Sequence, residues 1–312
     1  MMRRCFYGLL CVIALMFTTS ATAYASSPMI KKLVGKTVII LPVGYEGADV
    51  RYQHLRKDFG AAAEAYPAKE LALKKAKVVE YKEAEGSTFP VRFYLKLEVE
   101  GGGTAWYVDQ GSGEFLKEMV LASQVEEAGK WVNRSVWVKN AASLNLFKDS
   151  PMTVTSGGHS EELLKVRNTE KLTLGHVDIT NSGLLPFLFR VKTEDGKDGF
   201  LVVGGDVSEN LGRRFYLKDP KKENKWSEAI WKYIEEGRVQ IGMTEEQVGM
   251  AWGEADWRRN DEKAANIRVL AYDVYRLHFE NGKLVSMSEE KAPPKEKSKS
   301  KKEKNELPSN HP

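Results

Sequence analysis

Cysteine is nearly absent from this chain. Both cysteines, Cys5 and Cys11, lie within the first 25 residues, so the remainder offers no disulfide framework and no thiol chemistry. Long apolar runs are also missing after the N-terminal one. A spanning helix needs about 20 consecutive apolar residues, so we expect no transmembrane span in the mature chain.

Motifs of the common catalytic classes are missing as well. The sequence contains no Gly-x-Ser-x-Gly elbow, no His-Glu-x-x-His helix and no phosphate-binding loop. Its five histidines are scattered, without the spacing of metal ligands. His176 and Asp178 would share one face of a strand, and we interpret them as an exposed ion pair. We therefore expect a non-enzymatic protein without a metal site or a cofactor.

The chain begins with the features of an export signal. A basic start at residues 1–4 precedes an apolar run from Cys5 to Phe17 and a small-residue segment from Thr18 to Ser27. This order is typical of a secretory signal peptide, with cleavage expected after Ala25. We therefore expect a periplasmic or secreted protein; retention of the segment as an anchor is the alternative.

Positive charge is concentrated at the two ends. Of the formal net charge of +4, Arg3 and Arg4 supply +2. Seven lysines and three glutamates from Lys291 onward supply another +4. The remaining portion is slightly acidic, which argues against nucleic-acid binding. Residues 290–312 have almost no large apolar side chains, so we expect a disordered tail; weak contact with anionic surfaces is the alternative.

A faint internal repeat runs through the region after the signal. The stretch from Leu33 to Ile40 resembles residues 131–138, and the stretch from Phe89 to Lys96 resembles residues 185–192. Residues 89–96 and residues 185–192 are each followed by a glycine turn and another strand pattern. This order predicts two related β-rich domains built as small barrels or sandwiches. They resemble, loosely, SH3-like domains of bacterial envelope proteins. Within the first of these domains, the pattern of residues 68–78 predicts a helix.

Aromatic side chains are the candidate ligand-binding residues of these domains. Trp106 and Tyr107 are neighbours on a strand pattern and should face opposite ways, which leaves one exposed if the other is core. Trp131 and Trp137 lie six residues apart and would share a face of one strand. Burial in a core is one interpretation of the four. An aromatic groove for a glycan or an extended peptide is the functional alternative.

A compact module is expected near the C-terminus. Ser227 is a helix N-cap, and Thr244 with Gln247 forms a capping box that starts a second helix, which ends at Gly253. Strands are expected over residues 267–273, 274–280 and 283–288, with a hairpin turning on Asn281-Gly282.

The pattern of this hairpin leaves one question open. Tyr275, Leu277 and Phe279 would share one face, whereas Val285 and Met287 would fall on the opposite face across a two-residue turn. Either a bulge or a second buried face is needed.

The run from Ile241 to Val248, the pair Trp252-Gly253 and the Asn281-Gly282 hairpin together resemble the SmpA/OmlA (BamE-like) domain of bacterial envelope proteins. The resemblance covers residues 226–288. It implies a two-helix, three-strand α+β module that acts by protein contact. It also implies structural roles for Gly242, Thr244, Gln247 and Gly253. The family usually has proline two positions after the glycine, where this chain has Ala255.

The predicted fold is therefore multidomain, mainly β with α+β. We expect a binding or scaffolding protein of the cell envelope that contacts another envelope protein. A cell-wall (peptidoglycan) binding accessory protein or a secreted hydrolase subunit is the alternative. The expected parts are a signal peptide (1–25), two β-rich domains (28–128 and 129–220), a BamE-like module (224–289) and a Lys-rich tail (290–312).

Overall fold

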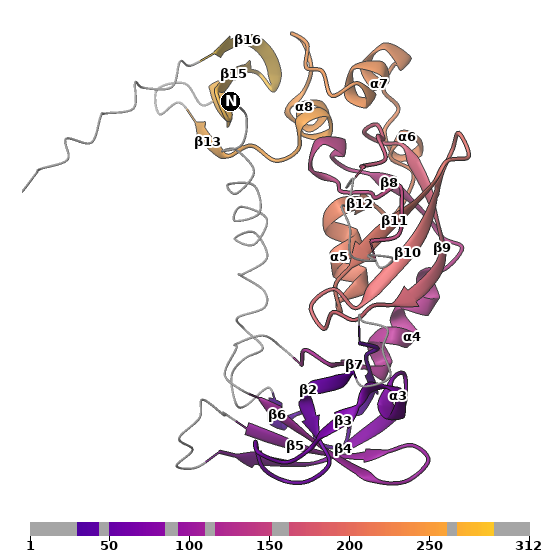
Figure 1. Cartoon of the computed structure of the whole chain (residues 1–312). Coiled ribbons are helices and arrows are strands. Elements are labelled where there is room, and N and C mark those ends of the chain that lie inside the picture. The colour runs from indigo at the N-terminus through magenta and orange to yellow at the C-terminus, as the bar shows by residue number, and fades with distance from the viewer. Residues whose placement is uncertain are drawn as a thin grey trace, which may run out of the picture. The chain divides into compact units, whose positions relative to one another are not determined.

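The computed structural model describes residues 30–43, 50–84, 93–109, 116–151, 162–260 and 267–289. The predicted signal peptide and tail lie outside these residues. By its contacts the chain divides into two compact units, Met1–Gly237 and Arg238–Pro312, and each is described by itself (Figure 1). The protein is mainly β, with antiparallel sheets of seven, five and four strands. No helix in the described part is long and apolar enough to cross a membrane.

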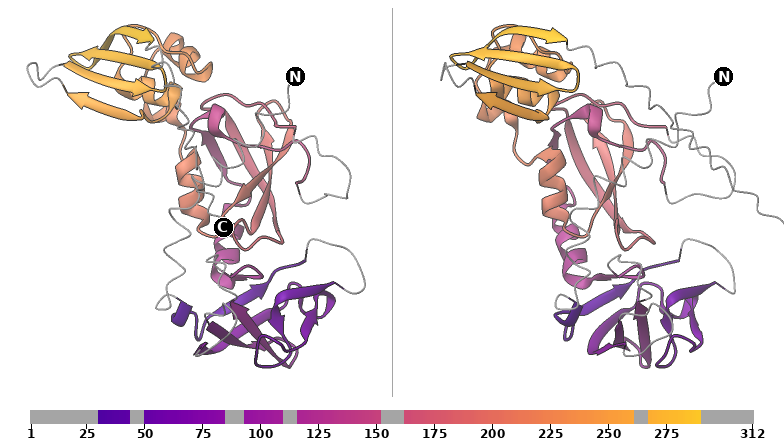
Figure 2. Two further views of the ribbon diagram at one scale, coloured as in Figure 1. Left: turned by 60° about the vertical axis from the view of Figure 1, so that its left-hand side comes forward. Right: turned by 90° about the vertical axis from the view of Figure 1, so that its left-hand side faces the viewer.

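The first unit contains two sheets that follow one another along the chain, with α4 leading from one to the other (Figure 2). The strand orders are β3-β2-β6-β5-β4-β1-β7 and β11-β10-β9-β8-β12. The strands of the first sheet are β1 (Thr37–Ile40), β2 (Arg51–Arg56), β3 (Ala65–Pro67), β4 (Lys75–Glu83), β5 (Phe93–Val99), β6 (Thr104–Asp109) and β7 (Met119–Leu121). Those of the second are β8 (Ser135–Val138), β9 (Lys171–Ile179), β10 (Phe187–Thr193), β11 (Asp198–Val203) and β12 (Phe215–Tyr216). The helices are α3 (Ala68–Leu71), α4 (Ala122–Trp131), η1 (Ala141–Ser143), α5 (Val207–Arg214), α6 (Pro220–Glu223) and α7 (Glu228–Glu235).

The two sheets repeat one strand arrangement. The order β6-β5-β4-β1-β7 has its counterpart in β11-β10-β9-β8-β12. The register agrees as well, because Val38 pairs with Ala76 between β1 and β4, and Val136 pairs with Leu172 between β8 and β9. Val38 and Val136 are equivalent positions of the repeat seen in the sequence. The repeat is therefore confirmed for its first pair of stretches. The strands of the second pair, β5 and β10, correspond at a displacement of 94, because Val78 pairs with Leu97 where Leu174 pairs with Val191; the displacement of 96 expected from residues 89–96 and 185–192 was wrong by two residues.

Irregular features are repeated too. The pairing of β4 with β5 shifts after Val78, and that of β9 with β10 shifts after Leu174, so a bulge lies at the same point of both sheets. The β2–β3 hairpin has a reduced counterpart in the second sheet, where Phe147 bridges both Phe200 of β11 and Leu163. One arrangement of strands thus occurs twice in the first unit.

The strands β1 and β7 contribute to the hydrophobic cores of both sheets. Ile40 and Met119 belong to the core of the first sheet. Their chain neighbours Ile39, Leu41 and Val120 belong to the core of the second sheet. Because successive strand residues point to opposite faces, this strand pair forms a wall between the two cores.

The second unit contains α8 (Glu245–Trp252) and a sheet of order β13-β14-β15-β16. The predicted capping box is confirmed: the Gln247 N–H donates to Thr244 Oγ1 at 3.2 Å, and the Thr244 N–H donates to Gln247 Oε1 at 2.8 Å. Before the helix, the Gly242 N–H donates to the Leu284 carbonyl at 2.8 Å. The strands are β13 (Trp257–Asn260), β14 (Ile267–Tyr272), β15 (Tyr275–Glu280) and β16 (Lys283–Glu289).

The β15–β16 hairpin contains a bulge, which answers the question left open by its pattern. Asn281 and Gly282 have φ of 49° and 73°, as expected for a two-residue turn of this type. The register shifts between His278 and Phe279, so that Leu284 lies opposite Phe279. The shift also places Met287 opposite Leu277, so that Leu284 and Met287 lie on the face of Phe279 and Leu277, while Val285 at the bulge is 41% exposed.

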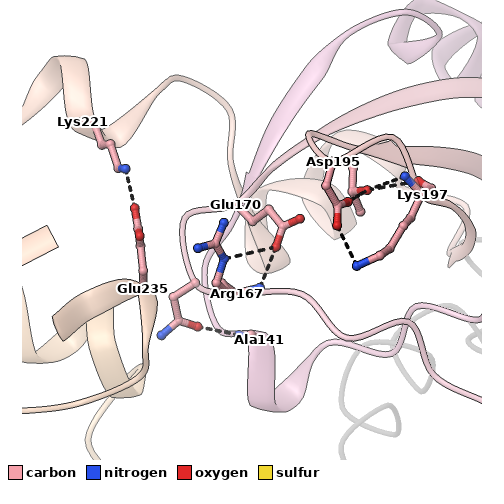
Figure 3. A network of polar contacts seen from close by, with 9 residues as sticks. Ala141, Arg167, Glu170, Asp195, Lys197, Lys221 and Glu235 are labelled. Atoms are coloured by element: carbon pink, nitrogen blue, oxygen red, sulfur yellow. Dashed lines mark hydrogen bonds and ion pairs between the residues drawn. The ribbon is translucent and has the colours of Figure 1, made fainter. Parts of the chain in front are cut away.

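The boundary between the units falls after Gly237, so α7 is grouped with the first unit rather than with α8. The predicted N-cap of this helix is present, since the Ile230 N–H donates to Ser227 Oγ at 3.4 Å. Asn168, which is buried, donates from Nδ2 to the Ile234 carbonyl at 3.0 Å. Figure 3 shows the ion pair between Lys221 and Glu235 of α7.

Candidate functional site

The aromatic residues predicted on β6 are both buried. Trp106 and Tyr107 are 7% and 1% exposed, so the expectation that one of them is exposed was wrong. Tyr107 lies in the core of the first sheet. Trp106 packs on the opposite face with Tyr94, and Phe59 covers it at a ring-centroid distance of 4.9 Å. Both faces of β6 are therefore covered.

The other predicted aromatic pair does not lie on one strand. Trp131 is the last residue of α4, and Trp137 lies in β8. Trp131 is buried, and its Nε1–H donates to Ser208 Oγ at 3.2 Å. Trp137 is half-buried. The expectation of a shared strand face was wrong because the helix continues to Trp131 before the chain turns at Asn133, whose φ is 65°.

The predicted ion pair on β9 is confirmed. His176 Nε2 lies 3.0 Å from Asp178 Oδ1, and the two side chains are 67% and 43% exposed. Arg190 Nε lies 4.0 Å from the other carboxylate oxygen. Within the described ranges, no group of three or more histidine, cysteine, aspartate or glutamate residues is arranged to hold a metal ion.

A pocket of about 300 Å³ lies in the second unit, between the end of α8 and the β14–β15 turn. Two backbone features shape it. Gly253 ends α8 with a φ of 88°, and Asp273 occupies the turn with a φ of 46°. The lining residues are Trp252, Glu254, Asp256, Tyr272, Asp273 and Tyr275.

Aromatic rings form one side of this pocket. The Trp252 ring lies edge-on to Tyr272, with centroids 5.4 Å apart and an interplanar angle of 79°. It also lies 5.4 Å from the Tyr275 ring. Tyr272 donates from its hydroxyl to the Gly253 carbonyl at 3.2 Å. This hydrogen bond orients the ring, and burial raises the pKa of Tyr272 above its usual range.

Carboxylates form the other side. Glu254, Asp256 and Asp273 are all exposed, and the Asp273 N–H donates to Asp256 Oδ2 at 2.6 Å, which holds the two acidic segments together. A nearby cation, Arg276, donates to the carbonyls of Asp273 and Tyr275 at 2.9 and 3.1 Å. Its guanidinium carbon lies 5.2 Å from the ring centroid of Trp257. Arg258 is a second neighbouring cation, because its charge acts on the pKa of Tyr272.

Rings beside carboxylates attract cations for two reasons. The faces of tryptophan and tyrosine are electrostatically negative and attract an ammonium or guanidinium group within about 6 Å. Carboxylates add a charge-assisted hydrogen bond to the same group. A volume of about 300 Å³ is at the lower end for ligand pockets, which suits one lysine or arginine side chain. The arrangement can therefore bind a basic side chain from a protein.

The sequence contained part of this signal. Trp252, Gly253 and Tyr272 belong to the segments that resemble the SmpA/OmlA domain, where Gly253 was given a structural role. The structure adds that the Gly253 carbonyl fixes Tyr272 in the pocket wall. Glu254, Asp256 and Asp273 were missed, although acids follow the tryptophan and the tyrosine within four residues.

No protein-family model, curated protein or solved structure matches this chain.

Proposed function

We propose that the protein is a non-enzymatic binding protein of the cell envelope that acts through protein–protein contacts. Its C-terminal unit is an SmpA/OmlA-like module in this proposal. The pocket of Trp252, Tyr272 and Tyr275 with its three acids receives a basic side chain of the partner. The observation that carries the proposal is the combination of rings and carboxylates around one small cavity.

The sequence supports the place of action. The basic, apolar and small-residue order of the first 27 residues is typical of an exported protein. The motif residues support the module, because Thr244 and Gln247 form the capping box that positions α8, and Trp252 at the end of α8 supplies the central ring of the pocket. The partner is an envelope protein that presents an exposed lysine or arginine.

The test of the pocket is a pair of tryptophan variants in the full chain. Trp252→Leu is expected to weaken binding of an acetylated, amidated tetralysine peptide about five- to thirtyfold, since cation–π contacts contribute about 1–2 kcal/mol in partly desolvated sites. The matched control is Trp257→Leu, because Trp257 is equally aromatic, 44% exposed and not a lining residue of the pocket. Titration calorimetry measures both.

Equal losses in the two variants, or none in either, would contradict the proposed pocket.

The physiological partner can be identified by photo-crosslinking in intact cells from position 273, with position 285 as the control on β16. A protein adduct from position 273 that disappears in the Trp252→Leu background identifies the partner and its contact site together.

A second candidate function, binding of cell-wall glycan, is favoured by an exposed aromatic surface on the first sheet. Phe59 is 49% exposed and packs on Tyr94 at 4.7 Å between ring centroids. Lys82 Nζ lies 4.9 Å from the Phe59 centroid. An aromatic face beside a cation suits a sugar that carries carboxylates.

Glycan binding predicts a specific loss on substitution of this residue. Phe59→Ala is expected to reduce co-sedimentation of the full chain with purified peptidoglycan several-fold, because the exposed ring is the one that a sugar can reach. Leu217→Ala, at another exposed apolar position (44%), is the control and should leave sedimentation unchanged. Unaltered sedimentation of the Phe59 variant would argue against this second function.

A further inference from the structure

The C-terminal tail leaves the second unit at the edge of the pocket. In the β15–β16 ladder, Glu289 is the partner of Tyr275, and Tyr275 lines the pocket. Paired strands lie about 4.8 Å apart, so the last residue of β16 is one strand spacing from a pocket residue. Tyr272 pairs with Tyr275 on the other side. The tail therefore starts in the row of residues that forms the aromatic wall.

The tail is positively charged, whereas the pocket is lined by three carboxylates. Residues 291–304 contain seven lysines at Lys291, Lys295, Lys297, Lys299, Lys301, Lys302 and Lys304. An extended chain covers about 3.3 Å per residue, so the first of these lysines needs only a short reversal of the chain to reach the cavity. Of the neighbouring cations of the folded unit, Arg276 already binds the backbone carbonyls of Asp273 and Tyr275.

We propose that the chain's own Lys-rich segment, residues 291–304, occupies the aromatic–acidic pocket in the absence of a partner. A lysine of the tail places its ammonium against the Trp252 and Tyr275 rings and the carboxylates of Glu254 and Asp273. The tail then acts as a tethered competitor that a partner must displace. This inference rests on the proposed function of the pocket.

The covalent attachment of the tail to the second unit determines how strongly it competes with a partner for the pocket. Short flexible linkers give an effective concentration in the millimolar range. If one lysine site has a dissociation constant of about 0.1 mM, a tail at about 1 mM effective concentration fills the pocket about nine-tenths of the time. An external basic peptide therefore meets a roughly tenfold reduction in apparent affinity.

The experiment compares three full-length proteins with one probe, a synthetic peptide of residues 291–304 with blocked ends. The first protein is unaltered. In the second, all seven tail lysines are replaced by glutamine. In the third, the tail acids Glu296, Glu303 and Glu306 are replaced by glutamine, which makes the tail more basic. Each is titrated with the peptide at low and at high salt.

The lysine-free tail is expected to bind the peptide about tenfold more tightly than the unaltered chain, and the more basic tail is expected to bind it more weakly. High salt should shrink both differences because it screens exposed charges. Equal affinities in the three proteins would overturn the tail proposal while leaving the pocket in place. Absence of peptide binding to all three, the lysine-free protein included, would overturn the pocket and the tail proposal together.

A second readout locates the occupied site directly. A photo-crosslinking residue at position 295 of the unaltered chain is expected to give an intramolecular adduct to the segment 252–256 or 272–275. The adduct should fall in the Trp252→Leu background. Adducts spread evenly over both units, or adducts only to anionic lipid vesicles added to the sample, would contradict the pocket as the place where the tail binds.

Discussion

Replacement of Glu118 by alanine is expected to lower the free energy of unfolding of the first unit by about 2–3 kcal/mol. The Glu118 carboxylate accepts from two successive N–H groups of β2, Gln53 at 2.6 Å and His54 at 2.9 Å. A buried donor left without a partner costs about 1–3 kcal/mol, and the Gln53 group, which is exposed, regains water. The His54 ring, 5% exposed, lies against the Val108 carbonyl at 3.0 Å, so little water reaches that side.

Denaturant unfolding measures the effect, with Glu98→Ala as the control. Glu98 is exposed on β5 of the same sheet, and substitutions at such positions usually change stability by no more than about 0.5 kcal/mol. A loss for Glu118→Ala no larger than that for Glu98→Ala would show that the two N–H groups do not depend on the carboxylate.

The same residue predicts a pH dependence with a definite sign. Burial raises the pKa of Glu118 above its usual range, and the charges and N–H donors around it offset part of this rise. A carboxyl group with a raised pKa in the folded state gives its full stabilisation below the unfolded pKa of about 4.3. That stabilisation is lost as the pH rises through the folded pKa. The stability deficit of Glu118→Gln relative to the unaltered chain is therefore expected to shrink from pH 4 to pH 7.

Local signals explain why parts of the C-terminal unit could be predicted. The capping box of Thr244 and Gln247 closes two hydrogen bonds within four residues, and the Asn281-Gly282 turn needs only its own left-handed backbone. Neither depends on distant packing. The internal repeat was visible for a similar reason, since a pattern that occurs twice can be recognised without knowledge of the fold.

Residues 68–78 show where local signals fail. The sequence pattern fits a helix, but α3 ends at Leu71 and β4 begins at Lys75. A strand forms from Lys75 onward because β1 and β5 pair with β4 on its two sides, and such pairing overrides a modest helix preference. Leu73 turns the chain between the two elements with a φ of 62°.

The candidate site could not be assembled from the sequence for a related reason. Its residues come from two segments, 252–256 and 272–275, that are separated by β13 and β14. Only the pairing of β13, which was not predicted, with β14 brings Asp256 next to the turn, where it accepts from the Asp273 N–H. The acids alone are unremarkable surface residues, and their proximity to three rings is a product of the sheet.

Substitutions of the last residue of β1 and of the residue that follows it are expected to destabilise both sheets of the first unit at once. Ile40 is fully buried in the core of the first sheet, and its neighbour Leu41 is 1% exposed in the core of the second. Truncation of a buried leucine or isoleucine to alanine costs about 2–5 kcal/mol. Ile40→Ala and Leu41→Ala should therefore each cost about that much, although they empty different cores.

Because the two cores share β1 and β7, we expect the first unit to unfold in a single transition. Loss of one core removes the packing on one face of β1 and β7, and these strands also complete the other core. Leu41→Ala is accordingly expected to speed amide hydrogen exchange in β4 and β5 of the first sheet as well as in β9 and β10 of the second. Val34→Ala, at a 41% exposed position just before β1, is the control and should leave exchange unchanged in both.

Two independent domains would behave differently. In that case Leu41→Ala would accelerate exchange only in β9 and β10, and a chain divided between residues 128 and 129 would yield two folded fragments. With a shared wall, the N-terminal fragment exposes Ile39, Leu41 and Val120, which are all buried in the intact unit. In the isolated fragment, β1 and β7 therefore lack the packing that the second core gives them in the intact unit. The repeated strand arrangement is therefore expected to fold as one cooperative body, and a two-step unfolding curve for the first unit would contradict this.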